Sequence, residues 1–244
     1  MIPPMVGAFI NSAGIVLGGV LARVLKTPVS ETNQTRAKIL LGVFTVWFGL
    51  SLTLSSLNGS AGRKIKQLAI VLLAMALGKL AGKLLRLQKL SNAAGQFATR
   101  KMAAPATGKT EFNNGFRVAT ALFCAAPLAI LGSVAEGLDP NGFSKVLCLK
   151  ALMDGMATMA FTRTFGWGVM VSAIPVLAWE GAIIRCAALQ EHALRIHGLI
   201  DSVNATDGLL IFSVALIILR IKKVAVAEYL PSLALAPFLT RWLL

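Results

Sequence analysis

Two charged side chains lie one helical turn apart within an otherwise apolar stretch of the sequence. The stretch is KALMDGMATMAF, in which Lys150 precedes Asp154 by four residues. Helical side chains at this spacing share one face and can form an ion pair. Because a charge at mid-bilayer costs about 2.5–3.5 kcal/mol on insertion scales, we expect Asp154 to face protein or water. The pair either binds a proton or cation or only fixes helix packing, and the spacing is compatible with both functions.

A second acid, Glu180, follows a proline in the apolar run PVLAWEGAII. Pro175 has no backbone N–H, so a continuous helix here would leave the carbonyl of Val171 without its donor. Broken helices with freed carbonyls often line ion and substrate sites in transporters. The alternative, which Trp179 favours, is a proline kink near the outer interface with Glu180 in water.

Asn11 and Pro127 lie in two other apolar segments that are rich in small residues. Asn11 precedes Gly14 and Gly18, a spacing that favours close contact with a neighbouring helix, and its amide needs a partner on another helix or on a ligand. Pro127 stands at the centre of an alanine-rich segment and predicts a bent, closely packed helix. The bend either borders a site or serves close packing alone.

Lys79 is the deepest cation of another apolar segment, beside the glycine pair Gly78 and Gly82. The sequence permits two roles for it. The ammonium group either attracts an anion or forms an ion pair across the bundle with Asp154 or Glu180.

The elements that position these residues are predicted to be transmembrane helices. The 244 residues are 56% hydrophobic and only 14% charged, with a mean hydropathy of +0.74, whereas a soluble domain carries about 25% charged residues. A spanning helix needs about 20 apolar residues. We predict an all-α polytopic bundle of eight spans, or seven if a weak segment does not cross, at residues 4–25, 37–57, 65–87, 116–134, 144–164, 168–189, 208–221 and 224–244.

The whole chain, residues 1–244, is predicted to form a single integral membrane domain of the cell inner membrane. Residues 88–114 are polar and are predicted as a cytoplasmic loop, and the distribution of Lys and Arg places both termini outside. Under this map five acids fall on the outer side, where we favour ordinary solvated loops over attraction of cations to an entrance: Glu136, Asp139, Glu191, Asp201 and Asp207.

Other functional classes find little support in the sequence. The net charge of +14 does not indicate nucleic-acid binding, because no basic stretch is interleaved with stacking aromatic residues. The cysteines and histidines match no metal-site spacing, and no nucleophile elbow or phosphate-binding glycine loop is present. We therefore expect no enzyme activity, no metal and no cofactor. The expected partners are the lipid bilayer, an unidentified small solute or ion, and a second copy of the chain.

Two segments of the chain are similar to each other in the order of their small and apolar residues. They are NSAGIVLGGVLAR in the first predicted span and SAIPVLAWEGAIIR in the sixth. These two spans run in opposite directions in our map, as an inverted repeat of three helices would require.

Three blocks of the second half resemble, in order, the YqgA/YdfK-like family of bacterial membrane proteins (domain of unknown function 554). They are GFRVATALFCAAPLAILGSVAEGL, LKALMDGMATMAF and FGWGVMVSAIPVLAWEGAI, with weaker likeness at AFINSAGIVLGGVL and EYLPSLALAP. The resemblance covers most of the chain and implies a multi-pass inner-membrane protein of a group often labelled as transporters. The family's Leu-Asp-Gly-like block falls on Met153, Asp154 and Gly155.

The chain also departs from the family pattern at charged positions. Glu180 stands where the resemblance implies glutamine, and Glu136 stands where it implies aspartate. Lys79 and Lys83 lie in a segment where the family tends to carry an acid. Site chemistry therefore does not transfer directly to these positions.

Two functional hypotheses follow. The first is a secondary transporter or ion-conducting protein for a small polar or charged solute, in which Asp154 responds to protons or cations. Lys150 would tune this acid, and Asn11 and Glu180 would be secondary lining. The second hypothesis is a non-transporting scaffold that forms oligomers or binds a partner, with Lys150 and Asp154 as a structural pair. A polar cavity at the membrane midplane would favour the first hypothesis.

Overall fold

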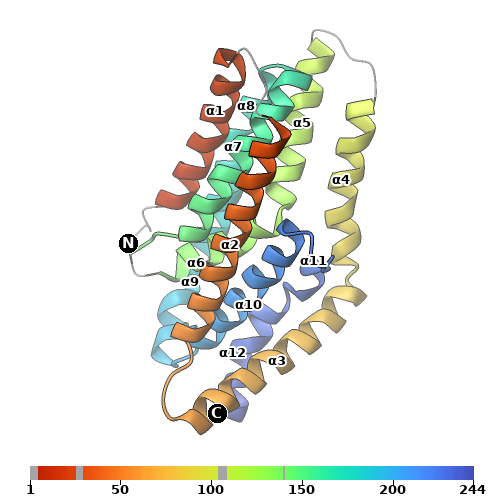
Figure 1. The fold of residues 1–244 in the computed structure, drawn as a ribbon. Coiled ribbons are helices and arrows are strands. Elements are labelled where there is room, and N and C mark those ends of the chain that lie inside the picture. The colour runs from red at the N-terminus through yellow and green to blue at the C-terminus, as the bar shows by residue number, and fades with distance from the viewer. Residues whose placement is uncertain (1–4, 26–29, 104–108, 140) are drawn as a thin grey trace. The chain divides into compact units, whose positions relative to one another are not determined.

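The structure is a computed structural model that describes residues 5–25, 30–103, 109–139 and 141–244, and every regular element in these ranges is a helix (Figure 1). The helices are α1 (Val6–Val24), α2 (Glu31–Ser55), α3 (Ala61–Leu84), α4 (Leu87–Ala103), α5 (Lys109–Ala125), α6 (Pro127–Leu138), α7 (Lys145–Phe165), α8 (Gly168–Val171), α9 (Ala173–Ile196), α10 (Ile200–Ile218), α11 (Val226–Tyr229) and α12 (Ser232–Leu243).

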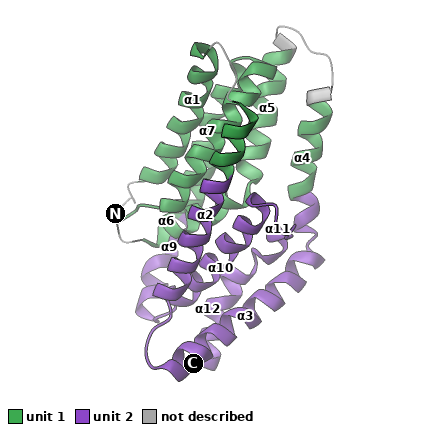
Figure 2. Ribbon diagram, in the orientation of Figure 1, with its two compact units in different colours: residues 1–38, 91–185 green, residues 39–90, 186–244 purple. Residues whose placement is uncertain are grey.

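The helices fall into two compact units, each built from two separate stretches of the chain (Figure 2). Unit 1 comprises residues 1–38 and 91–185, and it contains α1, most of α4, α5 to α8 and the first half of α9. Unit 2 comprises residues 39–90 and 186–244, and it contains most of α2 together with α3, α10, α11 and α12. Asn11, Lys150, Asp154 and Glu180 all belong to unit 1, whereas Lys79 belongs to unit 2.

Five helical stretches of the described chain are long and apolar enough to cross a membrane, and the bent pair α5–α6 would make a sixth. The five are α1, α2, α3, the stretch Gly168–Ile196 and α10. The predicted number of eight is therefore too high. Helix α7 carries Lys145, Lys150, Asp154 and Arg163, which lower its hydropathy, and the last predicted span is divided into α11 and α12, of 4 and 12 residues.

Helix α1 shows how these helices suit a membrane. Its buried side consists largely of small and polar residues, including Gly7, Asn11 and Ser12. Its outer side carries large apolar residues, with Leu17 60% exposed and Val24 69% exposed. A helix of a soluble protein has the opposite pattern. Since lipid tails solvate apolar side chains, association in a bilayer depends on close packing and polar contacts at the inner face.

Two predicted boundaries differ from the observed elements. The polar stretch 88–114, expected as a loop, contains most of α4 and the beginning of α5, because residues 87–103 lack proline and are rich in helix-forming Ala, Leu, Lys and Gln. Helix α10 begins at Ile200, so Asp207 lies inside it and not in the loop before it. The predicted start of the first span, Pro4, lies outside the described residues. The inverted repeat and the orientation stay predictions.

Two prolines lie near the predicted site, one at a bend between two helices and one just after a one-residue interruption of a helix. Helices α5 and α6 meet at an angle of 56°, and Pro127 is the first residue of α6, which confirms the predicted bend. Helices α8 and α9 are separated at Ser172, and Pro175 follows in the first turn of α9. Proline is tolerated there because the first N–H groups of a helix have no intrahelical acceptor.

Glycine brings α1 into backbone contact with α7. A Cβ added at Gly14 would lie 2.6 Å from the carbonyl oxygen of Ala151, and one added at Gly18 would lie 2.2 Å from that of Gly155. The contacting residue numbers increase together, from Gly14 and Ala151 to Gly18 and Gly155, so α1 and α7 run parallel. These small residues form a matched pair of surfaces that holds the two backbones together.

We predict that Gly18→Ala lowers the stability of the protein by about 1–3 kcal/mol, because the new methyl group would collide with a backbone carbonyl that cannot rotate away. The control is Gly95→Ala in α4, where a Cβ would meet nothing within 4 Å. This control should be neutral or stabilising by up to about 1 kcal/mol through helix propensity. Thermal unfolding in detergent measures both, and equal effects would contradict the α1–α7 contact.

Candidate functional site

Four side chains predicted from the sequence meet in one hydrogen-bonded cluster of unit 1. Lys150 forms ion pairs with Asp154 Oδ2 and with Glu180 Oε1, the latter at 3.2 Å. The amide nitrogen of Asn11 donates to the same two oxygens, at 2.7 Å to Glu180 Oε1 and 3.3 Å to Asp154 Oδ2. Each of these carboxylate oxygens therefore accepts from both donors, which closes a ring of four groups that we call the charge cluster.

Three helices bring the charge cluster together. The four-residue spacing on α7 places Lys150 and Asp154 on one face. Glycine contacts hold α1 against α7, which brings Asn11 within reach of the carboxylates. The hydroxyl of Ser12 donates to the carbonyl oxygen of Ala173 at 3.2 Å, which fixes α1 beside the start of α9. Glu180 lies two turns further along α9.

The charge cluster is closed to solvent in this structure. Asn11 and Glu180 are fully buried, Lys150 is 1% exposed and Asp154 is 6% exposed. Lys150 therefore does not extend to the interface, and the interpretation that placed Glu180 in water is wrong because α1 and α7 cover it. Phe123 lies one turn before the Pro127 break, and its ring centre is 5.9 Å from Lys150 Nζ.

Four buried polar residues form a continuous stripe along α7. Lys150, Asp154, Thr158 and Thr162 follow one another at intervals of four residues, and all are buried. Twelve residues of helix correspond to about 18 Å, which is the length of the stripe along α7. The sequence analysis singled out only the first two members. The regular spacing of the two threonines was the available signal for the rest.

The two threonines of the stripe do not donate hydrogen bonds to carbonyl groups of their own helix. Thr45, Thr53 and Thr206 each donate to the carbonyl four residues earlier, as buried helical threonines usually do. The hydroxyls of Thr158 and Thr162 make no hydrogen bond among the described residues. Unit 1 also holds the unpaired Ser133 hydroxyl, the unpaired side-chain oxygen of Asn11 and the unpaired second oxygen of Glu180. Buried polar atoms without a partner are rare in proteins, so these atoms are candidates for contact with water or solute.

The position of Glu136 in the structure differs from the predicted one. It was expected in a solvated outer loop, but it is fully buried on α6. Its Oε1 accepts a hydrogen bond of 2.9 Å from the backbone N–H of Gly7, in the first turn of α1. A carboxylate at a helix N-terminus satisfies a donor without an intrahelical acceptor and interacts favourably with the helix dipole. Glu136 thus replaces the missing side-chain cap of α1.

The other predicted residues do not join the charge cluster. Lys79 is exposed on α3, where its Nζ lies 5.4 Å from the centre of the Tyr229 ring, and the acids it was expected to pair with are paired with Lys150 instead. Pro127 and Pro175 are not among the groups that bond within it; they lie at the helix breaks beside Phe123 and before Glu180.

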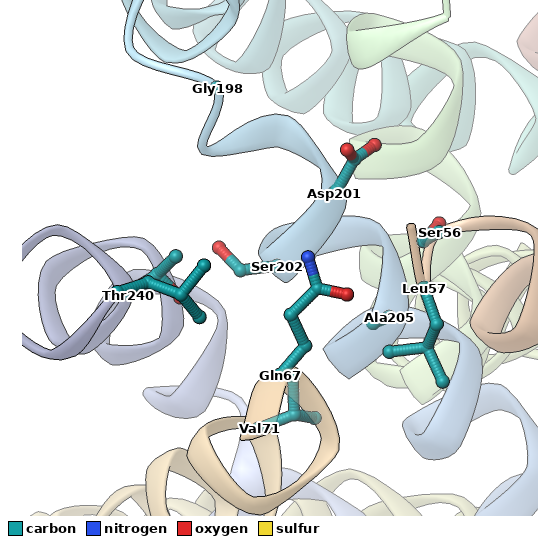
Figure 3. A pocket seen from close by; sticks show the side chains of 10 residues that line it. Ser56, Leu57, Gln67, Val71, Gly198, Asp201, Ser202, Ala205 and Thr240 are labelled. Carbon is teal, nitrogen blue, oxygen red and sulfur yellow. The ribbon is translucent and has the colours of Figure 1, made fainter. Parts of the chain in front are cut away.

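Unit 2 contains a small polar cavity of about 40 Å³, which is room for a few water molecules. Figure 3 shows its lining, which includes the side chains of Gln67, Asp201, Ser202 and Thr240. Asp201 accepts a hydrogen bond of 2.9 Å from the side-chain amide of Asn58. This acid is half-buried and lies at the start of α10, as expected of an acid near a helix end.

The chemistry available to the charge cluster is the binding of one positive charge. Its one lysine and two acids carry one excess negative charge when all three are ionised. No three His, Cys, Asp or Glu residues gather into a metal-holding group anywhere in the described ranges. The arrangement thus suits a proton or a monovalent ion better than a multidentate metal centre.

We predict that Lys150→Gln lowers stability by about 3–5 kcal/mol, because it leaves two buried acids without their counter-charge. Arg195→Gln is the matched control, since Arg195 pairs with Glu191 at the same four-residue spacing but is half exposed. Removal of that exposed pair should cost less than about 1 kcal/mol. Both effects are measured by thermal unfolding at one pH and salt concentration. A Lys150 effect as small as that of Arg195 would contradict the observed burial.

The comparisons with known proteins give a family and no activity. The chain matches the family described as "Protein of unknown function (DUF554)" over residues 6–241. It is 27% identical over 234 residues to the uncharacterised membrane protein YdfK of Bacillus subtilis, covering 96% of this chain and 94% of that protein. It is 28% identical over 247 residues to the uncharacterised protein YqgA of Escherichia coli, covering 98% and 97%. No solved structure matches.

Proposed function

The chain belongs to the DUF554 family of unknown function, and from this premise we propose that it is a secondary transporter or ion-conducting membrane protein for a small polar or charged solute. The observation that carries the proposal is the stripe on α7. It joins a buried charge cluster to two buried hydroxyls that make no bond within the described protein. Intramembrane ionisable residues commonly mark substrate, ion and proton pathways.

The net charge of the cluster supports a coupled ion. One excess negative charge in an apolar surrounding is costly, and neutralisation by one bound proton or monovalent cation removes that cost. Binding and release of this ion would alter the bonds that Lys150 and Asn11 make to Asp154 and Glu180. Because these groups belong to α1, α7 and α9, such a change would alter the contacts among these three helices.

The helix breaks support movement at the same place. The α5–α6 break lies next to Phe123, whose ring centre is 5.9 Å from Lys150 Nζ. The one-residue interruption between α8 and α9, at Ser172, precedes Glu180 by two turns. Since the charge cluster is closed in this structure, solute would reach it only after a rearrangement of these segments. Broken helices around a central site are a recurring arrangement in secondary transporters.

The scaffold hypothesis accounts for fewer of these features. A structural ion pair needs its remaining polar atoms to be satisfied, because unpaired buried groups cost about 1–3 kcal/mol each. Thr158, Thr162 and the second oxygen of Glu180 have no such partners among the described residues. A scaffold gains nothing from them, whereas a solute pathway requires free donors and acceptors.

We further propose that the protein resides in the inner membrane with both termini outside, and that it works without enzymatic activity or a resident cofactor. This orientation is the one that the distribution of Lys and Arg gives for eight predicted spans. It requires an even number of spans, a condition that six spans, the upper number in the described chain, also meet. Its partners would be the surrounding lipid, the transported solute or ion and, where the glycine-rich faces are free, a second copy.

The proposal predicts that Thr158→Val impairs transport without destabilising the protein. Valine has nearly the shape of threonine, and removal of a buried unpaired hydroxyl is neutral or stabilising. Loss of one hydrogen bond to a passing solute, about 1.4 kcal/mol, would slow flux about tenfold. Thr45→Val is the control, because the hydroxyl of Thr45 is bonded to its own helix at 2.6 Å.

The measurement uses proteoliposomes with an internal pH-sensitive dye, to which amino acids, amines, organic acids and Na⁺ or Li⁺ are added one at a time. Wild-type protein should show solute-dependent ion movement that Thr158→Val slows and Thr45→Val does not. Equal flux in both variants would show that the α7 stripe does not contact the moving solute. No movement with any solute, combined with a loss of stability in Thr158→Val, would support the scaffold.

A further inference from the structure

Unit 2 contains an acid that no observed interaction explains. Asp207 is fully buried in α10, one of the five helices able to cross a membrane. Neither of its carboxylate oxygens has a hydrogen-bond partner, and no ion pair reaches it, among the residues that the structure describes. Burial of an ionised carboxylate without a partner is energetically unfavourable. The carboxyl group must therefore be protonated or be paired with a positive charge.

The surroundings of Asp207 resemble those of Asp154 in one respect. Both acids precede a glycine, and each of those glycines packs on a glycine of a neighbouring helix. A Cβ added at Gly155 would lie 2.9 Å from the carbonyl oxygen of Gly14, and one added at Gly208 would lie 2.6 Å from that of Gly49. In both units, therefore, an Asp-Gly pair stands at the closest approach of two helices.

The two acids differ in their counter-charge. Asp154 has Lys150 four residues earlier, whereas the same position before Asp207 is Val203. Helices α2, α3, α11 and α12 pack against α10 within unit 2. The part of α2 in unit 2 has no charged residue, and the charged residues of the other three are all exposed or half-buried: Arg63, Lys64, Lys66, Lys79, Lys83, Glu228 and Arg241.

We propose that Asp207 is a second ion-binding site, and that the ion it binds is a proton. A protonated carboxyl needs no counter-charge and suits an apolar site. A metal cation would need several oxygen ligands around it, and no group of three acids, histidines or cysteines gathers among the described residues. The site is independent of the charge cluster in unit 1, and its proton exchanges with solvent when α10 becomes accessible.

The test is labelling of the wild-type protein in liposomes with dicyclohexylcarbodiimide, an apolar reagent that modifies protonated carboxyl groups. The modified fraction of the peptide that contains Asp207 is measured by mass spectrometry over a range of pH, and reagent decay at each pH is divided out. Labelling should appear at Asp207 and fall about tenfold per pH unit beyond its titration midpoint, as the protonated fraction of a single carboxyl does.

Asp207→Asn is the negative control, and Asp154→Asn should leave labelling of Asp207 unchanged. This second variant also separates the two proposals, because failure of transport through unit 1 does not alter the expected labelling in unit 2. Three outcomes would overturn the proposal. Labelling that does not change with pH indicates a permanently neutral structural acid, absence of labelling at every pH indicates a matched charge, and protection by Na⁺ or Li⁺ at constant pH indicates a metal-cation site.

Discussion

The charge of Lys150 is the constraint on which the rest of unit 1 depends. A buried ammonium group is stable only when acids match it and hydrogen bonds satisfy the oxygens that remain. One acid comes from the same face of α7, and the second must come from another helix, which is α9. Two acids then need a further donor, which Asn11 supplies from α1. The small residues of α1 and α7 follow from this need, because a bulky interface would hold the amide out of reach.

The same constraint relates the capping of α1 to the site. The amide of Asn11 reaches two acids only if α1 keeps a fixed position along α7. Two contacts, one on each side of Asn11, fix the position of α1. Glu136 binds the first turn of α1, and Gly18 lies against Gly155. Glu136 belongs to α6, which begins at the Pro127 break. Direct contacts therefore connect that break to α1 and, through Asn11, to the charge cluster.

The sequence predicted the features that depend on local spacing. The Lys150–Asp154 pair, the polar partners that Asn11 requires and the bend at Pro127 each follow from a few neighbouring residues. The burial of Glu180, Glu136 and Asp207 could not be predicted in this way, because it depends on which helices cover them. Low hydropathy in residues 88–114 predicts a loop, but polarity does not prevent a helix, and α4 forms there. The excess of predicted spans has a related cause, since the charged residues of α7 make it less apolar than the helices that are able to cross a membrane.

The difference between Asp154 and Asp207 has a chemical consequence. An acid that shares a lysine and an asparagine with a second acid changes its bonds when it gains or loses charge, so its titration is coupled to helix contacts. Asp207 makes no hydrogen bond among the described residues that a change of its charge could break. Ionisation of this acid changes only the free energy of burying a charge in an apolar environment. The first arrangement is suited to converting ion binding into movement. The second, under the inference drawn for Asp207, is suited to holding a proton until its environment changes, since no ion pair or hydrogen bond among the described residues has to break when the proton leaves.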